Sequence, residues 1–357
     1  MRLTEEQEAL RSAVRSLLAR HEGPAAWRPL TEQIGVSGLA VPEEYGGAGC
    51  GAREVHAVME ELGRTLSPVP YLGSAVLAVQ ALLASDDPAA CAQLLPRLAE
   101  GRAVGCLAWA EQGSWDPASI QAEAAPGRGG TWLITGVKEH VLDGAEADVL
   151  LVVARTTAGV SLFEVAVDST GLRREAAVTM DQTRAQARVV LDAAEGRLIG
   201  TDGEGDRILG HVLSLACAAL AAEQVGAAER ALELTVAYAK ERVQFGRPIG
   251  SFQAVKHRLA DAYVLVESAR SAALGAAFAA AEGSPELIRC AAVAKSACSE
   301  ALSTVAGEMV QLHGGIGITW EHDAHRFLKR AHGAAQLFGP PAWHRHRLAA
   351  DLGLATA

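Results

Sequence analysis

Tyr238 to His257 reads YAKERVQFGRPIGSFQAVKH, and this stretch joins two long helical patterns. An Ala-rich, proline-free run from residue 207 to 242 precedes it, and a second helical pattern begins at Phe252. Between them, the Gly- and Pro-containing segment 245–250 predicts an elbow. The elbow carries cationic, amide and aromatic side chains of the kind that hold a phosphate-bearing ligand: Arg242, Phe245, Arg247, Gln253 and Lys256. Taken alone, the same residues fit a helix hairpin with solvated arginines better.

Composition limits the function classes. The 357 residues are enough for two or three domains, and half of them are hydrophobic although only 4% are aromatic. Apolar content made mostly of Ala, Leu and Val predicts closely packed helices. The net charge of -10 argues against a broad basic surface for nucleic acid or anionic membranes.

Cysteine usage and apolar runs predict a cytoplasmic protein. The six cysteines are scattered, with no CxxC pair and no ligand-like spacing to histidine. The charged, amphipathic N-terminal segment does not resemble a signal peptide. The most apolar run, residues 208–225, contains Glu223 and Gln224, so we expect a helix buried in a bundle and no membrane span.

Periodicity divides the chain into helices, then strands, then helices. Helical patterns cover 4–18, 54–66, 74–84 and 89–100, and short alternating runs occupy 104–108, 131–137, 147–154, 160–167 and 188–191. Helical spacing returns at 207–242, 252–281, 284–312 and 321–336, with a last helix after Pro341. The glycine-rich segment 200–205 is interpreted as a linker, because no Rossmann-type unit surrounds it. We therefore predict a mainly α fold with a central β-domain.

The motifs closely resemble the acyl-CoA dehydrogenase family of flavoproteins. The resemblance is strongest in AYAKERVQFGRPIGSFQAVKHRLAD and, further along, QLHGGIGITWEHDAHRFLKRA. GLAVPEEYGGAG and EELGRTLSPVPY resemble the N-terminal helical domain of that family, and ITGVKEHVLDGAEADVLLVVAR resembles its middle β-barrel. The resemblance covers nearly the whole chain. It implies an N-terminal α-helical domain at 1–102, a middle β-barrel domain at 103–200 and a C-terminal four-helix-bundle domain at 201–357.

The resemblance implies FAD held between subunits. Arg242 and Phe245 match the family's Arg-x-x-Phe-Gly motif, in which the guanidinium faces the pyrophosphate and the ring packs near the adenosine half. Gln253, Gln311, Gly314 and Gly315 match its other cofactor positions. An arginine fork suits phosphate, and glycine lets the backbone approach a ligand closely. Singly, each residue could be a helix cap or a surface residue; together they favour the cofactor.

The β-domain departs from the family pattern where the chain passes the flavin ring. The family's Thr-Glu-Pro followed by Gly-Ser-Asp corresponds to AEQGSWD at residues 110–116, so that Ala110 replaces the threonine. Its Trp-Ile-Thr contact corresponds to residues 140–142, HVL. These differences predict degraded ring contacts, and they predict that His140 is a packing residue and not a catalytic one.

The resemblance also implies a carboxylate base that this chain lacks. Family members remove the pro-R α-proton of the thioester while the β-hydrogen leaves as hydride to flavin N5, which needs a positioned base. The family places that base at one of two positions, and these fall on Ala216 and Phe338. A register error of one residue gives no carboxylate either. The catalytic residue is therefore unknown.

Other polar residues are weaker candidates. Asp206, Glu321 and Asp323 are acids, but helix-start residues on a solvated surface explain them better. The histidines at 322, 325, 344 and 346 form no zinc pattern, and those at 344 and 346 alternate with arginines, which predicts surface charge.

The leading hypothesis is a heteromeric acyl-CoA dehydrogenase, similar to actinobacterial enzymes that degrade steroid side chains. In such assemblies one of two homologous chains keeps the base, and this chain resembles the other. The partners implied are acyl-CoA, a homologous subunit in a dimer or heterotetramer, and an electron-transfer flavoprotein as acceptor. Two alternatives are a self-sufficient homo-oligomeric dehydrogenase with an unrecognised base, and a structural or ligand-binding member without redox chemistry.

Overall fold

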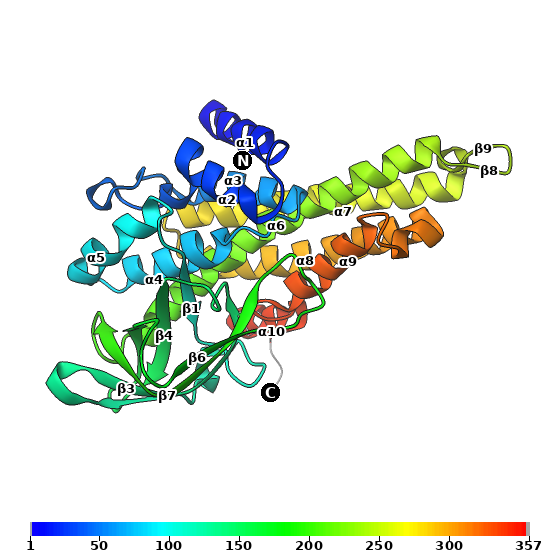
Figure 1. The fold of residues 1–357 in the computed structure, drawn as a ribbon. Coiled ribbons are helices and arrows are strands. Elements are labelled where there is room, and N and C mark those ends of the chain that lie inside the picture. The colour runs from blue at the N-terminus through cyan, green and yellow to red at the C-terminus, as the bar shows by residue number, and fades with distance from the viewer. Residues whose placement is uncertain (1, 355–357) are drawn as a thin grey trace. The chain divides into compact units, whose positions relative to one another are not determined.

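The computed structural model describes residues 2–354 (Figure 1), and these form two compact units. One unit combines the chain through Leu18, His56–Ser67, and the chain from Cys217 on. The other combines Ala19–Val55 with Pro68–Ala216. Each unit is described by itself below.

The second unit contains short helices and a β-barrel. Most of its short helices precede the strands: η1 (Gly23–Ala26), α2 (Trp27–Pro29), η2 (Leu30–Ile34), η3 (Val36–Gly38), η4 (Glu43–Tyr45), η5 (Tyr71–Ala78), α4 (Val79–Ala84) and α5 (Pro88–Ala99). Two further turns of helix, η6 (Pro117–Ser119) and η7 (Arg128–Gly130), lie between strands. The strands are β1 (Gly105–Ala108), β2 (Glu123–Pro126), β3 (Trp132–Leu142), β4 (Val149–Arg155), β5 (Val160–Val165), β6 (Leu172–Ala176) and β7 (Gln186–Ile199).

Strand pairing closes the sheet on itself. The order is β1-β4-β2-β3-β7-β5, β6 pairs with β7, and β4 also pairs antiparallel with β5. The ring β4-β2-β3-β7-β5 therefore returns to β4, as a barrel requires. Its interior is apolar, with Ile134, Val152 and Phe163 fully buried. The predicted β-barrel is confirmed.

Two strands of the barrel sheet, β2 and β6, were not predicted from the sequence. β2 reads EAAP and β6 reads LRREA, and neither alternates cleanly between apolar and polar residues. Both are short and mostly exposed. Cross-strand pairing in the sheet, and not local propensity, makes them strands.

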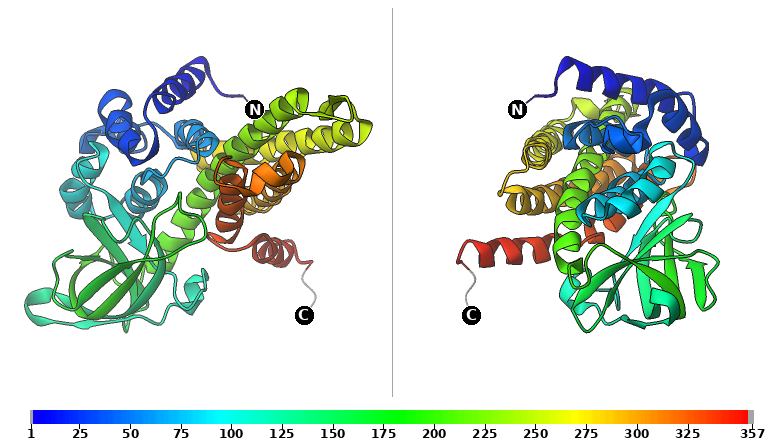
Figure 2. Two further views of the ribbon diagram at one scale, coloured as in Figure 1. Left: turned by 45° about the vertical axis from the view of Figure 1, so that its right-hand side comes forward. Right: turned by 90° about the vertical axis from the view of Figure 1, so that its left-hand side faces the viewer.

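The first unit is a helical bundle. Its helices are α1 (Glu5–Leu18), α3 (Ala52–Arg64), α6 (Gly205–Glu241), α7 (Gln253–Ala281), α8 (Leu287–His313), α9 (Ala324–Gln336) and α10 (Pro341–Asp351), of which α3 and α6 each extend into the second unit. Figure 2 shows α6 and α7 running side by side, joined at their far end by a small hairpin of β8 (Val243–Gln244) and β9 (Arg247–Pro248). Alanines dominate the contacts among α6, α7 and α8, as the composition predicts.

Helix ends differ from expectation at α8. The Ser284-Pro285-Glu286 sequence predicts a helix start at Ser284, but α8 begins at Leu287. Ser284 instead makes a turn in which its Oγ accepts from the backbone N–H of Glu286 at 3.2 Å. The predicted stop is confirmed, because Gly314 ends α8 with φ 63° and ψ -140°, a conformation that favours glycine.

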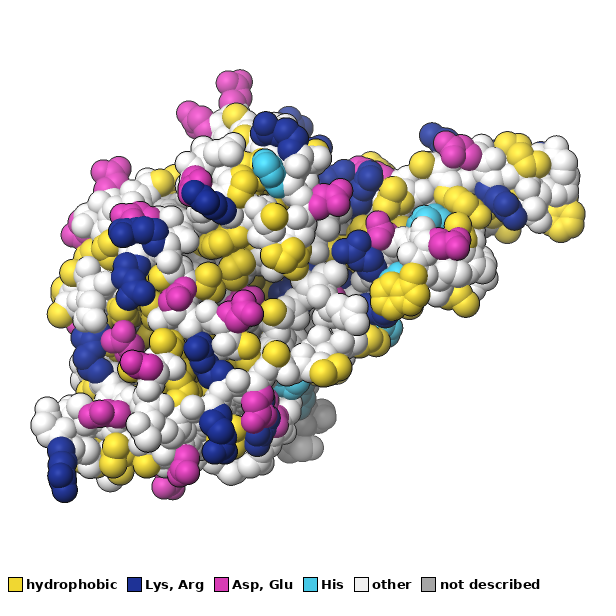
Figure 3. Space-filling model, in the orientation of Figure 1, with side chains coloured by type: hydrophobic (Ala, Val, Ile, Leu, Met, Phe, Trp, Pro, Cys, Tyr) yellow, Lys and Arg dark blue, Asp and Glu magenta, His cyan; other side chains and the backbone are white. Residues whose placement is uncertain are grey.

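Among residues 2–354, two helices are long and apolar enough to cross a membrane by length and composition. In α6, 83% of the most apolar window is buried, so that window is the core of a bundle, as expected. In α7 only 33% of the corresponding window is buried. On the face in Figure 3, basic and acidic side chains are interspersed.

Candidate functional site

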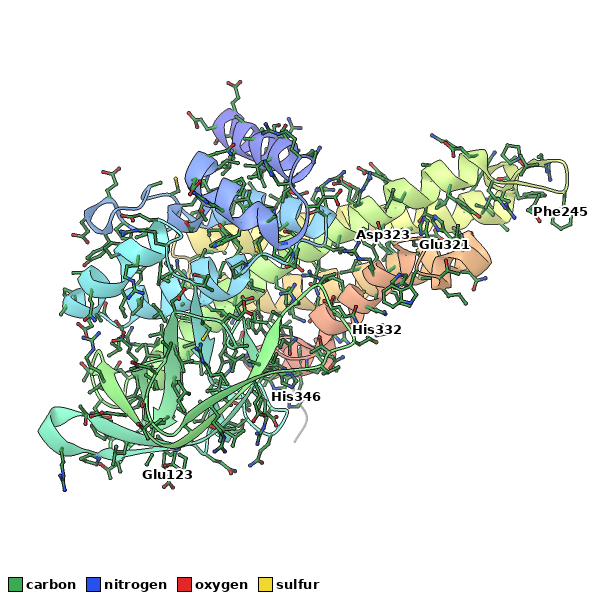
Figure 4. The ribbon with its side chains drawn as sticks, viewed as in Figure 1. Glu123, Phe245, Glu321, Asp323, His332 and His346 are labelled. Atoms are coloured by element: carbon green, nitrogen blue, oxygen red, sulfur yellow. The ribbon has the colours of Figure 1, made fainter. Side chains whose placement is uncertain are left out.

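The elbow after α6 is a tight β-hairpin. β8 (Val243–Gln244) pairs antiparallel with β9 (Arg247–Pro248), and a 3-10 turn, η8 (Ile249–Ser251), leads into α7. Phe245 and Gly246 form the two-residue turn with φ 53° and 77°, the backbone of a type I′ turn. The Phe245 side chain is 92% exposed and lies at the far end of the hairpin (Figure 4).

Arg242 is held by its backbone and leaves its side chain exposed. Its N–H donates to the Tyr238 carbonyl at 2.8 Å, and its carbonyl accepts from the Ile249 N–H at 2.8 Å. Its guanidinium makes no hydrogen bond or ion pair to another residue of the described chain, 2–354. Arg247 differs, because its guanidinium carbon lies 4.0 Å from the ring centroid of Phe252.

The glycine turn that follows α8 is open. A Cβ at Gly314 or Gly315 would meet no atom within 4 Å, and both glycines are exposed. Gln311, on the last turn of α8, is exposed as well. A ligand could therefore approach this backbone directly.

The elbow and the glycine turn meet through aromatic rings. The Tyr238 ring, one turn before Arg242 on α6, stacks on His313 with centroids 4.3 Å apart. The Tyr238 hydroxyl donates to the His313 carbonyl at 3.4 Å, and His313 Nδ1 bonds to the Met309 carbonyl at 2.7 Å. Burial lowers the pKa of His313. Exposed cationic, amide and glycine groups thus gather at one end of the bundle, which fits the phosphate-bearing half of FAD.

Both predicted base positions are buried hydrocarbon. Ala216 lies inside α6 with no exposed surface. Phe338 follows α9, is 1% exposed and has φ 60°, an uncommon conformation for phenylalanine.

Polar side chains hydrogen-bond to the backbone around Phe338. The Phe338 carbonyl lies 3.0 Å from His344 Nε2. The buried Lys295 ammonium donates to the carbonyls of Ala335 at 3.0 Å and Gly339 at 3.2 Å, and to Ser299 Oγ at 3.1 Å. Three donors meet three acceptors, so this lysine orders the segment after α9.

The prediction that His344 is surface charge is wrong. His344 is buried, and burial lowers its pKa to about 4. The packing of α10 on α8 buries the side of α10 that carries His344 but leaves His346 exposed. Alternation with arginines could not show which side of α10 is covered.

The β-domain positions that the sequence predicts to lie near the flavin ring carry aromatic side chains. Trp115 stacks on His140 with centroids 5.5 Å apart, and Trp109 lies 5.5 Å from Trp115. His140 has φ 54°, and its Nδ1 lies 2.9 Å from Gln186 Oε1.

Glu111, the acid retained in this region, is structural. It is ion-paired with the buried Lys138 at 2.5 Å, and its carboxylate accepts from the backbone N–H groups of Gln121 at 2.8 Å and Ala122 at 3.0 Å. Burial lowers the pKa of Lys138 to about 8. Sequence reasoning missed Lys138 as the partner of this glutamate, since only the fold brings the two together.

Comparison with known proteins identifies the family. Residues 4–102, 106–193 and 203–353 match the acyl-CoA dehydrogenase N-terminal, middle and C-terminal domains. The chain is 42% identical to the acyl-CoA dehydrogenase IpdE2 of Mycobacterium tuberculosis over 98% of each chain. The chain belongs to the acyl-CoA dehydrogenase family. It is a FAD-dependent acyl-CoA dehydrogenase, an oxidoreductase acting on CH–CH groups.

Two solved structures of this family are similar along the whole chain. A chain of the ChsE4–ChsE5 complex from Mycobacterium tuberculosis is 30% identical, with a TM-score of 0.90, and the match covers 100% of this chain and 99% of that one. A chain of the Tcur3481–Tcur3483 steroid acyl-CoA dehydrogenase is 32% identical, with a TM-score of 0.88, over 98% of both. Each of these is named for two different chains.

The other acids considered from the sequence lie on the surface of this dehydrogenase. Asp206, Glu321 and Asp323 are exposed, and Asp323 pairs with Arg326 at 2.9 Å. Figure 4 labels Glu321 and Asp323, both in the segment before α9. Within residues 2–354 no cluster of three or more His, Cys, Asp or Glu side chains could hold a metal.

A cavity in the second unit was missed by sequence reasoning. It has a volume of about 560 Å³ and includes Asp143 and Arg184 among its lining residues. Asp143 directly follows β3, so it lies beside the strand end that the sequence predicts to be a flavin contact. Burial raises the pKa of Asp143 to about 7, while Arg184 opposes the shift. A single acid after a strand carried no sequence signal.

Proposed function

We propose that this chain is the subunit of a heteromeric acyl-CoA dehydrogenase that completes a FAD site but supplies no base. The observation that carries the proposal is the pair Ala216 and Phe338, both buried and neither ionisable. Abstraction of a weakly acidic α-proton needs a positioned base, so a second chain must supply it.

The cofactor half of the site supports FAD binding by this chain. Bound FAD would accept a hydride from the β-carbon of the acyl group. Arg242 would pair with the pyrophosphate through charge-assisted hydrogen bonds, and Phe245 would pack on the adenosine half. Gln253 and Gln311 would supply amide groups, and Gly314 and Gly315 would let the ligand lie close to the backbone.

The β-domain supports the proposal that the two subunits have different roles in the site. Trp115 stacks on His140 where family members hold the flavin ring, so this chain's own barrel presents a different surface there. We infer that the flavin ring and substrate lie against the partner's barrel.

A homologous dehydrogenase subunit is the proposed partner. The similar solved chains come from two-chain assemblies, and α7 exposes apolar side chains such as Tyr263 and Val264. An acyl-CoA thioester is the proposed substrate, with steroid-type or other lipid acyl groups, and electron-transfer flavoprotein is the proposed acceptor. A cytoplasmic location goes with this proposal.

The test is co-expression of the chain with a homologous subunit that carries a base carboxylate. We expect a stable complex with a flavin absorption spectrum that reduces a dye on addition of acyl-CoA, and we expect the single chain to be inactive. A carboxylate-to-amide change in the partner should abolish the reaction without loss of flavin.

Two results would contradict the proposal. Dye reduction by the single chain would favour the self-sufficient alternative. A mixture without complex and without flavin would favour the non-redox alternative.

A further inference from the structure

The cavity beside Asp143 lies entirely within the second unit. Its wall is largely apolar and includes Pro24, Pro68 and Pro70 from the helical segments and Val104 from the start of β1. Its volume of about 560 Å³ falls in the range of small-molecule sites. None of the proposed cofactor residues or base positions lines it.

Asp143 is presented to the cavity by a constrained turn. It has φ 56°, its N–H donates to the Ala185 carbonyl at 3.1 Å, and its carbonyl accepts from the N–H groups of Glu146 and Ala147. Close packing holds the side chain in place, because a Cβ on Gly73 would come within 2.5 Å of Asp143 Oδ2.

Arg184 reaches the same cavity from the loop before β7. The Asp181 carboxylate accepts from the Thr183 N–H at 3.0 Å and from its hydroxyl at 2.5 Å, which shapes the turn that precedes Arg184. Arg184 is itself buried and lines the cavity together with Thr179. A second arginine, Arg174 of β6, donates to the carbonyls of Gly144 at 3.3 Å and Ala147 at 2.7 Å.

The charges around Asp143 are balanced. Arg184 in the lining and Arg174 outside it carry positive charge, and Glu146 is an exposed acid in the lining. Burial raises the pKa of the Cys106 thiol, and the nearby Asp143 charge adds to that shift. In the cavity an anion would meet Asp143 and Glu146, and a cation would meet Arg184. Neither charge is favoured by this arrangement.

A pure hydrocarbon also fits poorly. It would desolvate the Asp143 carboxyl and the Arg184 guanidinium without offering a hydrogen bond to either. A keto oxygen can accept from Arg184 or from protonated Asp143, and a hydroxyl can donate to ionised Asp143.

We propose that this cavity binds an uncharged, compact, largely apolar molecule whose hydroxyl or keto oxygen bonds to Asp143 and Arg184. The apolar wall packs on the body of the molecule, and the charged pair fixes its oxygenated end. The inference does not rest on the proposed subunit role, because no residue of the FAD or base positions takes part.

The test uses the bicyclic probes 2-decalone and 2-decalol and the anionic analogue decahydro-2-naphthoate. Binding to the purified full chain is followed by ligand-detected NMR and titration calorimetry at pH 8. We expect both neutral probes to bind and the carboxylate to bind about tenfold more weakly. Equal or tighter binding of the carboxylate would overturn the proposal.

Single substitutions of cavity residues test where the probes bind. Asp143→Asn should weaken 2-decalol binding about fivefold, and Arg184→Gln should weaken 2-decalone binding by about the same factor. The matched controls Asp168→Asn and Arg188→Gln change residues outside the lining and should leave binding unchanged. Unchanged binding in both cavity variants would refute the assignment.

A further variant tests the proposal even if the two charged-residue variants do not fold. Ala177 lines the cavity but is exposed, so Ala177→Trp should fold and fill the space. We expect it to abolish binding of both neutral probes while its thermal unfolding stays close to that of the parent protein. Retained binding in this variant would overturn the proposal even if the charged variants misfold.

Discussion

Arg242 shows how one residue can be prepared for a ligand by its backbone. Two backbone hydrogen bonds, to Tyr238 and Ile249, fix its position at the corner between α6 and the β8–β9 hairpin. Because the backbone is already ordered, binding of the exposed guanidinium to a diphosphate should cost little conformational free energy.

We predict that Arg242→Ala weakens FAD binding by about 10- to 100-fold, the loss expected when a charge-assisted hydrogen bond is removed. Because the proposed FAD lies between subunits, assembly should weaken too. Flavin content and native mass measure both effects. Arg289→Ala, which breaks a surface pair with Asp351, is the control, and full flavin retention by Arg242→Ala would contradict the assignment.

His344 is a second residue with a measurable role. Its folded pKa of about 4 lies below the unfolded value of about 6.5, so the unfolded chain binds a proton more readily. Its contribution to stability is therefore complete above about pH 6.5 and is lost as the pH falls towards 4.

We predict that His344→Gln reduces the acid sensitivity of the protein. Between pH 7 and pH 5, protonation of His344 in the unfolded chain should lower the free energy of unfolding by about 2 kcal/mol. The variant should not show this decrease. Denaturant titrations at the two pH values measure the difference. His346→Gln is the control, and part of the slope should persist in both variants because buried His56 has a folded pKa of about 4 as well. An unchanged slope in His344→Gln would disprove the assignment.

At the scale of elements, α3 and α6 cross through paired glycines. A Cβ at Gly63 would come within 2.0 Å of the Glu223 carbonyl oxygen, and a Cβ at Gly226 within 1.8 Å of the Glu60 carbonyl oxygen. Neither backbone can move away without separating the helices. The crossing also positions Glu223 for its buried ion pair with Arg330 of α9 at 2.9 Å.

We predict that Gly226→Ala destabilises the protein by about 1–3 kcal/mol, because the added methyl overpacks a backbone contact. Gly307→Ala, in α8 with nothing within 4 Å of the new Cβ, should instead stabilise by up to about 1 kcal/mol through helix propensity. Thermal or denaturant unfolding distinguishes the two. Equal effects of the two substitutions would show that the crossing is not tight.

At the scale of the whole molecule, α7 is an apolar helix that its own chain covers only in part. Tyr263 is 59% exposed and Val264 is 61% exposed, side by side on the helix. We propose that these exposed apolar side chains contact another chain.

We predict that Val264→Glu weakens assembly with the partner subunit at least about tenfold, since a charge would be desolvated in the contact. Flavin content should fall with it if the cofactor lies between subunits. Analytical ultracentrifugation of the mixed subunits gives the association constant. Val167→Glu, on an exposed residue of the β-domain, is the control, and unaltered assembly by Val264→Glu would exclude this face.

Local patterns predicted most of the fold. The charged first helix, the apolar α6, the Gly314 stop and five strands have sequence signatures that span a few residues, and the structure has each of them. β2 and β6 lack such signatures and exist because β3 and β7 offer them pairing partners. The domain boundaries at residues 102 and 200 and the cofactor residues from Arg242 to Gly315 remain predictions.

By itself the sequence determined the family, the order of the helices and of the strands other than β2 and β6, and hydrocarbon side chains at the two positions predicted for the family's base. These depend on motifs and on residue identity alone. Tertiary structure decided that His344 is buried, that Lys138 pairs with Glu111, and that Asp143 and Arg184 share a cavity. Those facts depend on which faces of distant segments pack together, and packing is a property of the folded chain that no local pattern encodes.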